Sequence, residues 1–166
     1  MDLESLTALG IEVDTSSRRR AEYSYDASNY RVPPLAVVFP RTADEVAAVM
    51  AHAHRHHIPV IGRGGGTSMA GNAIGAGLVI DMSRHMTKVT RIDAENRTAT
   101  AESGIVLTTL AALVGAATDG RLTFAPDPSS ASRAALGGAI GNDACGNHSV
   151  RHGRTTDHIE SLDIVT

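Results

Sequence analysis

The sequence has no tryptophan, and its aromatic residues of all kinds make up 3% of the 166 residues. A ring-shaped ligand would therefore be held by backbone and small side chains more than by aromatic stacking. One cysteine is present, Cys145, which excludes a disulfide within the chain and suits a reducing compartment. Lysine is equally scarce, since Lys88 is the only one.

Long apolar runs and strongly basic segments are also missing. No uninterrupted apolar run approaches the roughly 20 residues that span a bilayer. The N-terminus, MDLESLTALG, is acidic and lacks the basic region of a signal peptide. The net charge is −3 and no basic run is longer than residues 18–20, so nucleic acid is not expected as a partner. With 42% hydrophobic residues, the chain can build one domain or two small lobes that share a core.

The most informative stretch is PVIGRGGGTSMAG, residues 59–71. Consecutive glycines, here residues 64–66, lose much backbone entropy on folding, so they are typical of places where backbone approaches a ligand closely. Free N–H groups in such a turn form a concave anion site. Arg63 adds a cationic fork, and Thr67 and Ser68 add hydroxyl donors. The stretch predicts a loop that binds phosphate or pyrophosphate, with a plain glycine-rich turn as the alternative.

This glycine loop matches neither standard phosphate-binding motif. A Walker loop requires Gly-Lys-Ser/Thr, and the stretch contains no lysine. The dinucleotide fingerprint requires a third glycine that leads into a helix, whereas Thr67 takes that place and residues 72–77 are rich in glycine and alanine.

Hydrophobic patterning predicts strand, helix, strand around the glycine loop. The strands are expected at residues 35–39 and 58–61, and the helix at 42–56, where Thr42 and Glu45 form a capping box. A parallel pair with a right-handed crossover places the loop at the carboxyl end of the sheet, where α/β proteins bind ligands.

The remaining residues predict further elements and a leader. Residues 1–31 are interpreted as the leader, with a short helix near residues 3–9 and an irregular tyrosine-containing stretch. The other expected elements are a strand at 77–81, a hairpin of 88–93 and 98–101, a helix at 106–117, and strands at 122–125 and 159–165.

Histidines crowd the end of the predicted helix. His52 and His56 have the i, i+4 spacing that can share a metal ion, but no carboxylate or cysteine accompanies them at ligand spacing. Cationic histidine also suits a helix C-terminus. We therefore expect no metal site.

A second stretch dense in small residues is LGGAIGNDACGNHS, residues 136–149. One side of it is nearly without side chains, which predicts contact with a large flat ligand or with another backbone. Pro126 and Pro128 fix an extended approach just upstream.

Together, the glycine loop, the PDPSS turn and this second stretch resemble the FAD-binding (PCMH-type) domain of the vanillyl-alcohol oxidase / p-cresol methylhydroxylase superfamily. Within it, the chain looks similar to FAD-linked D-2-hydroxy-acid dehydrogenases acting on D-lactate, glycolate or D-2-hydroxyglutarate. The resemblance covers roughly residues 28–166. It implies an α+β fold in which a small parallel α/β lobe packs on a mostly antiparallel sheet lobe. It also implies an N-terminal leader (1–31) and a FAD-binding domain (32–166) that is incomplete at its C-terminus, with the cap domain absent.

The resemblance also implies a cofactor site, with no catalytic residue or metal ligand inside the chain. FAD is expected to be non-covalent, because Thr67 stands where covalently flavinylated relatives carry histidine. Asp143 departs from the usual Thr-Asn-Ala sequence of the second stretch and leaves its own contact with the cofactor open. The residues implied to bind FAD are Gly62, Arg63, Gly64, Gly65, Gly66, Thr67, Ser68, Pro126, Asp127, Gly137, Gly138, Gly141, Asn142, Cys145, Gly146 and Ser149.

The function implied is the FAD-binding portion of an enzyme that oxidises a D-2-hydroxy acid by hydride transfer to FAD. The partners implied are the hydroxy acid, held by the missing cap domain, and an electron acceptor such as a quinone or an iron–sulfur region. The expected location is cytoplasmic or peripheral to the inner face of the membrane, and an oligomer is left open. Two alternatives stand: a non-catalytic flavin-binding electron-transfer module, and a structural domain that binds nothing.

Overall fold

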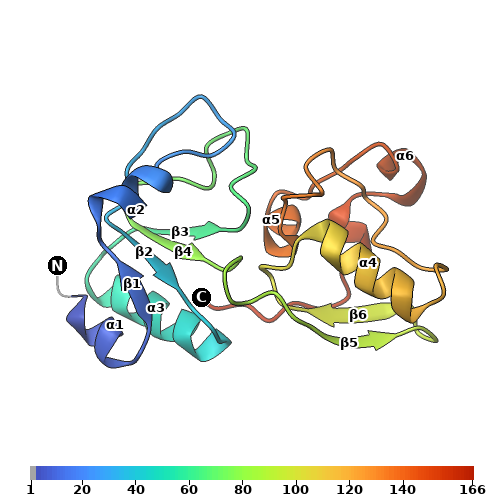
Figure 1. Ribbon diagram of the computed structural model, residues 1–166, viewed down its shortest axis with the longest axis horizontal. Coiled ribbons are helices and arrows are strands. Elements are labelled where there is room, and N and C mark those ends of the chain that lie inside the picture. The colour runs from blue at the N-terminus through green and yellow to red at the C-terminus, as the bar shows by residue number, and fades with distance from the viewer. Residues whose placement is uncertain (1–2) are drawn as a thin grey trace.

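The computed structural model describes residues 3–166, which form two lobes side by side (Figure 1). The first lobe contains a four-stranded sheet in the order β1-β2-β4-β3. The second contains a two-stranded sheet, β5-β6, with several helices. The chain passes between them after β4, so the space between the lobes lies beside the ends of the first sheet (Figure 1).

Three strands of the first sheet are parallel. They are β2 (Ala36–Phe39), β4 (Leu78–Asp81) and β3 (Val60–Arg63), and β4 pairs in parallel with both neighbours. Strands β2 and β4 are buried throughout, whereas β3 is half-buried at the edge of the sheet. Parallel strands covered on both faces read as continuous apolar runs, which explains the sequences AVVF and LVID. The expected direct pairing of the first and second predicted strands is wrong, because β4 lies between β2 and β3.

Alternate residues of these strands build two cores. Ala36, Val38, Leu78 and Ile80 pack with residues of α1 (Glu4–Ala8) and α3 (Ala43–Arg55) on one face. Val37, Phe39 and Val79 face Tyr23, which follows α2 (Ser17–Glu22), on the other.

The cap of α3 agrees with the sequence in part. Thr42 Oγ1 accepts a hydrogen bond from Glu45 N at 3.2 Å, as expected. The Glu45 carboxylate accepts instead from Arg41 N, at 2.8 Å, one residue before the cap.

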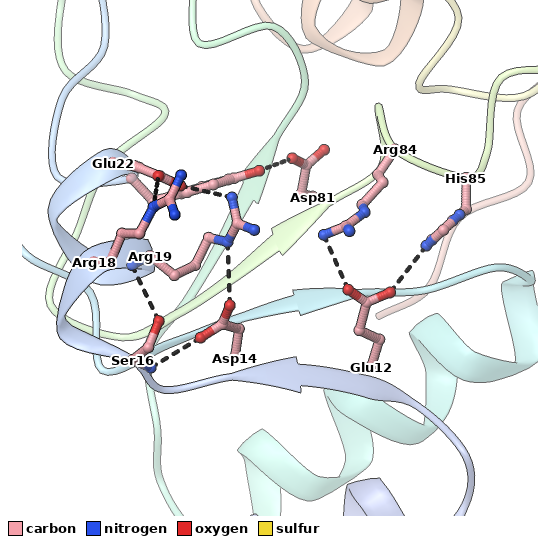
Figure 2. Close-up of polar contacts among 10 residues, drawn as sticks. Glu12, Asp14, Ser16, Arg18, Arg19, Glu22, Asp81, Arg84 and His85 are labelled. Carbon is pink, nitrogen blue, oxygen red and sulfur yellow. Dashed lines mark hydrogen bonds and ion pairs between the residues drawn. The ribbon is translucent and has the colours of Figure 1, made fainter.

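The N-terminal segment is part of the first lobe, where it supplies helices and an edge strand of the sheet. Its expected helix is α1, which ends before Gly10 at φ +79°. Strand β1 (Glu12–Asp14) pairs antiparallel with β2, and neither it nor α2 was predicted. Glu12 also contacts Arg84 at 2.9 Å and His85 at 3.2 Å, beyond the end of β4 (Figure 2). The domain boundary at residue 31 stays a prediction.

The second lobe begins with the predicted hairpin, β5 (Val89–Asp93) and β6 (Thr98–Ala101), which pair antiparallel. The predicted helix follows as α4 (Leu107–Ala117), whose Leu110 and Val114 pack on the hairpin. The glycine-rich second stretch is more helical than expected, since it contains α5 (Leu136–Gly141) and α6 (Ser149–His152). The 3-10 helix η1 (Thr155–His158) comes after it.

Two predicted strands are wrong. Residues 122–125 and 159–165, all of which the structure describes, form no strand. At the first, Thr118 Oγ1 of the α4 C-cap accepts from Leu122 N at 3.1 Å, and Pro126 then removes a donor. At the second, apolar alternation is present, but a strand also requires a partner for its backbone groups, and Leu162 and Ile164 stay exposed.

Within residues 3–166, none of the helices has the length and apolar character needed to cross a membrane.

Candidate functional site

A cavity of about 360 Å³ lies between the two lobes. One wall comes from the first lobe and the other from the second. The first wall consists of Gly62, Gly64, Gly65, Gly66, Thr67, Ser68, Met69, Ala70, Asn72 and Ala73. The second wall consists of Pro128, Ser129, Ser130, Ala134, Ala135, Gly138, Ala139, Asn142, Ala144 and Cys145.

Each wall is positioned by an element that ends or begins at the cavity. Strand β3 ends at Arg63 and delivers the glycine loop at the carboxyl end of the parallel sheet, as predicted. On the other side, Val106 pairs with Ala135, which places the start of α5 against the loop. Leu107 N donates to Ala134 O at 3.0 Å and fixes the same segment to α4.

The consecutive glycines allow the two walls to touch. A Cβ on Gly65 would lie 1.9 Å from Arg133 O, and one on Gly64 would lie 2.6 Å from Ala135 Cβ. These two residues are therefore glycines because protein atoms of the second lobe approach them. Gly66 has φ +65°, which glycine adopts readily. The sequence predicted close approach at this loop, and the approaching group here is the chain itself.

Other glycines face open space. A Cβ on Gly62, Gly138 or Gly141 would meet no heavy atom of the described residues within 4 Å. Gly62 and Gly138 line the cavity. Gly137 and Gly146 instead pack against other parts of the chain, since a Cβ added to Gly137 would meet Ser103 and one added to Gly146 would meet the backbone of Asp127. The bare side predicted for the second stretch is thus divided between a cavity-facing part and an internally packed part.

The guanidinium of Arg63 is engaged within the first lobe, and its predicted role as a fork for phosphate stays a prediction. Arg63 lies outside the lining residues, and its Nη1 donates to Ala73 O at 2.8 Å. Its Cζ lies 4.9 Å from the centroid of the Tyr23 ring. Burial lowers the pKa of the guanidinium, while the nearby Asp81 and Asp26 carboxylates oppose this change.

Several other predicted site residues lie beside the cavity rather than on it. Ser149 Oγ accepts from Gly146 N at 3.0 Å and donates to Pro126 O at 3.3 Å, so it ties the second stretch to the proline turn. Asp127 pairs with His148 at 3.3 Å and lines a smaller hollow of about 210 Å³ beside α4. Pro128 borders both hollows.

Asp143 directs its carboxylate to the start of η1. The carboxylate accepts from Thr156 N at 3.1 Å and Thr156 Oγ1 at 2.9 Å, and pairs with Arg154 at 2.9 Å. The two hydrogen bonds from Thr156, helped by Arg154, hold the pKa of Asp143 below its usual range. Asp143, which departs from the usual sequence of the second stretch, therefore links the segment after α5 to η1. It adds no carboxylate to the cavity lining.

Asparagine side chains meet across the cavity. Asn72 Nδ2 donates to Asn142 Oδ1 at 3.4 Å, a contact between the two lobes. Asn72 N also donates to Ser68 Oγ, at 3.2 Å, so the hydroxyl of Ser68 closes the glycine loop on itself. Asn142 was predicted as a site residue, whereas Asn72 was not.

The sequence reasoning missed about half of the lining. The missed residues are Met69, Ala70, Asn72, Ala73, Pro128, Ser129, Ser130, Ala134, Ala135, Ala139 and Ala144. Ser129 and Ser130 belong to the PDPSS turn and were within reach of that motif. The alanines carry no chemical signal of their own, and only their neighbours in space assign them to a site.

The histidine cluster serves packing at the end of α3. His52 is buried, its Nδ1 lies 3.1 Å from Ser5 Oγ, and its ring centroid lies 4.4 Å from that of His56. In the part of the chain that the structure describes, no three His, Cys, Asp or Glu side chains are grouped to hold a metal ion.

The cavity suits an extended anionic dinucleotide such as FAD. Among the described residues, those that line it include no carboxylate, so nothing there repels a pyrophosphate. Its polar groups are loop backbone, the hydroxyls of Thr67, Ser68, Ser129 and Ser130, and the two asparagine amides. The open face of Gly138 leaves room for a flat ring against the backbone. The chemistry of the lining therefore fits FAD.

Comparison with known proteins points the same way. A model of the family described as "FAD binding domain" matches residues 34–166. A D-2-hydroxyglutarate dehydrogenase of Pantoea ananatis is 36% identical over 96% of this chain. The glycolate oxidase subunit GlcD of Bacillus subtilis is 35% identical over 92% of it. The resemblance stated from the sequence is confirmed.

A solved structure supports the fold. An alkyldihydroxyacetonephosphate synthase superposes on 93% of this chain with a TM-score of 0.82 at 23% identity. The α+β class, with one mainly parallel and one antiparallel sheet, is thereby confirmed. The chain spans 16% of the Pantoea relative, 32% of the Bacillus relative and 30% of the solved chain.

Proposed function

The chain belongs to the FAD-binding domain family, and from this premise we propose that it holds the FAD of an enzyme that oxidises a D-2-hydroxy acid. The observation that carries the proposal is the similarity of nearly the whole chain to a D-2-hydroxyglutarate dehydrogenase and to a glycolate oxidase subunit. When bound, FAD supplies the acceptor for the hydride that leaves the α-carbon of the hydroxy acid.

The residues of this chain bind and orient the cofactor. Residues 62–68 hold the pyrophosphate through backbone N–H groups and the hydroxyl of Thr67. The Ser68 hydroxyl shapes this loop, since it donates to Asn72 Oδ1 and accepts from Asn72 N. Threonine forms no covalent bond to flavin, so FAD is held non-covalently. Gly138 leaves space for a ring against α5, and Cys145 and Asn142 border the same wall.

The groups that bind and deprotonate the substrate are proposed to lie outside residues 32–166, which we assign to the FAD-binding domain. The relatives are several times longer than this chain. Within the described residues, the cavity lining holds no histidine, arginine or lysine that could bind a carboxylate or take a proton. An electron acceptor is a further proposed partner.

The second candidate is a flavin-binding module that passes electrons without oxidising a substrate itself. This electron-transfer function is favoured because, among the described residues, those that line the cavity include no acid–base group. The two functions share the cofactor and differ in whether a hydroxy acid reduces it.

The test is a flavin titration followed by substrate reduction. Purified protein that contains this chain is reconstituted with FAD, its visible spectrum is recorded, and it is mixed anaerobically with D-2-hydroxyglutarate, glycolate or D-lactate. Loss of the visible flavin absorption supports the enzyme if it occurs with D-2-hydroxyglutarate or D-lactate but not with the L-enantiomer, or if it occurs with glycolate, which is achiral. A bound flavin that no hydroxy acid bleaches favours the module, and no flavin binding refutes both.

Acid precipitation of the reconstituted protein tests the role of Thr67. Flavin released into the supernatant agrees with non-covalent binding.

Cys145 offers a separate readout, because it is the only cysteine of the chain, is exposed and lines the cavity. Bound FAD is expected to slow its reaction with a thiol reagent.

A further inference from the structure

The glycine loop is held at both ends by residues that do not line the cavity. At one end, Gly66 O accepts from Ala27 N at 3.1 Å. At the other end, Ala73 N donates to Asp26 Oδ2 at 3.3 Å, and Ala73 O accepts from Arg63 Nη1 at 2.8 Å. Between these anchor points, residues 67–70 and 72 line the cavity.

Arg63 is itself fixed from the N-terminal segment. Its guanidinium lies on the face of the Tyr23 ring, and the Tyr23 hydroxyl donates to Asp81 Oδ2 at 2.5 Å. Burial, with the hydrogen bond to the Asp81 carboxylate, raises the pKa of Tyr23, so the phenol stays neutral. A Cβ on Gly66 would lie 2.5 Å from Arg63 Nη2, which shows how closely the guanidinium supports the loop.

Asp26 makes the second anchor. Its Oδ1 accepts from Ser28 N at 2.9 Å, and its Oδ2 accepts from Ala73 N. Burial by itself would raise the pKa of Asp26, but the hydrogen bonds from Ser28 and Ala73, helped by Arg63, lower it. The carboxylate is therefore ionised at neutral pH and can accept both bonds.

We infer that Tyr23, Asp26 and Arg63 are positioning residues of the FAD site, which shape the glycine loop from the side away from the cofactor. The inference rests on the proposed binding of pyrophosphate by that loop. It makes the segment before residue 28 part of the cofactor site, although the resemblance to the family began near residue 28. It also gives Arg63 a role different from contact with phosphate.

The two roles of Arg63 predict different results for lysine. A lysine at a phosphate contact keeps its charge and most of the affinity. A lysine in the observed place lacks the planar fork that donates to Ala73 O while lying across the Tyr23 ring. We therefore expect Arg63→Lys to raise the dissociation constant of FAD about tenfold, as for a lost charge-assisted hydrogen bond.

Asp26→Ala and Asp14→Ala form a matched pair for the second anchor. Both carboxylates lie in the N-terminal segment, and both accept a bond from a serine N–H two residues on. Asp14 then pairs with Arg19 at 3.2 Å in a half-buried contact, whereas Asp26 reaches the glycine loop (Figure 2 shows the Asp14 contacts).

The experiment combines hydrogen exchange without flavin and titration with FAD and riboflavin. Asp26→Ala and Arg63→Lys are expected to speed amide exchange within residues 64–73 and leave strands β2 and β4 protected. They are expected to raise the dissociation constant of FAD about tenfold and that of riboflavin, which has no phosphate, less than about twofold. Asp14→Ala is expected to change neither.

The outcomes separate this inference from the proposed function. If the wild-type protein binds no FAD, the proposed function fails, and the exchange rates still decide whether these residues shape the loop. If it binds FAD but Arg63→Lys binds as tightly as wild type, the inference is wrong. Equal losses for FAD and riboflavin, or exchange that rises throughout the sheet, would indicate general destabilisation and overturn it as well.

Discussion

Replacing Gly138 by alanine adds one methyl group that should change the stability of the fold and the affinity for FAD in opposite directions. Gly138 lies within α5 and lines the cavity, and its added Cβ would meet no heavy atom of the described residues within 4 Å. Alanine is favoured over glycine inside a helix by about 0.5–1 kcal/mol. The flavin-free protein should therefore gain stability, with a melting temperature higher by about 1–4 °C for a chain of this size.

The same methyl group should weaken FAD binding. It projects into the space that the proposed ring would occupy against the α5 backbone. Forcing one methyl into a close-packed contact costs about 1–3 kcal/mol, which corresponds to roughly five- to 150-fold in the dissociation constant. Stability and affinity thus change in opposite directions, which general damage to the fold does not produce.

Differential scanning fluorimetry without flavin and a FAD titration measure the two effects. Gly115→Ala is the control, since Gly115 lies in α4 away from the cavity and its Cβ would also be in open space. It should stabilise to a similar extent and leave FAD binding unchanged. Wild-type affinity in Gly138→Ala would refute contact between the cofactor and this face of α5.

Three further predictions concern packing, burial and pH. Gly65→Ala should lower stability by about 1–3 kcal/mol in chemical denaturation even without flavin, because its Cβ would lie 1.9 Å from Arg133 O; unchanged stability would contradict the contact between the walls. Tyr23→Phe should lower it by about 1.5–3 kcal/mol through the lost bond to the Asp81 carboxylate, while Tyr30→Phe, 63% exposed, should be neutral. Because the folded pKa of Asp143 is lowered, its contribution to stability is complete above about pH 4 and is lost as the pH falls through the folded pKa. Melting temperatures of wild type and Asp143→Asn should therefore converge toward pH 2, and a constant difference would contradict this.

Local signals in the sequence were sufficient for most of the first lobe. Buried parallel strands have few alternatives to continuous apolar runs, and Thr42 marks the start of α3 by its own chemistry. Strand β1 was missed because its three residues, EVD, are too few to show the alternation of apolar and polar side chains that indicates a strand. The order of the strands was missed because β4 inserts between β2 and β3. Local sequence patterns predict strands but do not predict which strands are neighbours.

The site illustrates a different limit of sequence reasoning. Clustered glycines located the cavity correctly, since both stretches contribute to its walls. They could not show what approaches each glycine, because a ligand and a neighbouring backbone exclude a Cβ equally. Arg63 shows the same limit for charge: a cation next to a phosphate-type loop predicts a contact with phosphate, and only the position of Tyr23 and Ala73 reveals its other use.

The contact between the two walls fixes the shape of the cavity before a ligand binds. Gly64 and Gly65 rest on residues 133–135, and Asn72 reaches Asn142, so the glycine loop itself joins the lobes. On its far side the same loop is anchored to Asp26 and Arg63. A loop held from both sides loses little further freedom when a ligand binds, which favours affinity through pre-organisation. The glycines that bring the lobes into contact and the anchors that hold the loop therefore act on one quantity, the geometry of the loop residues that line the cavity.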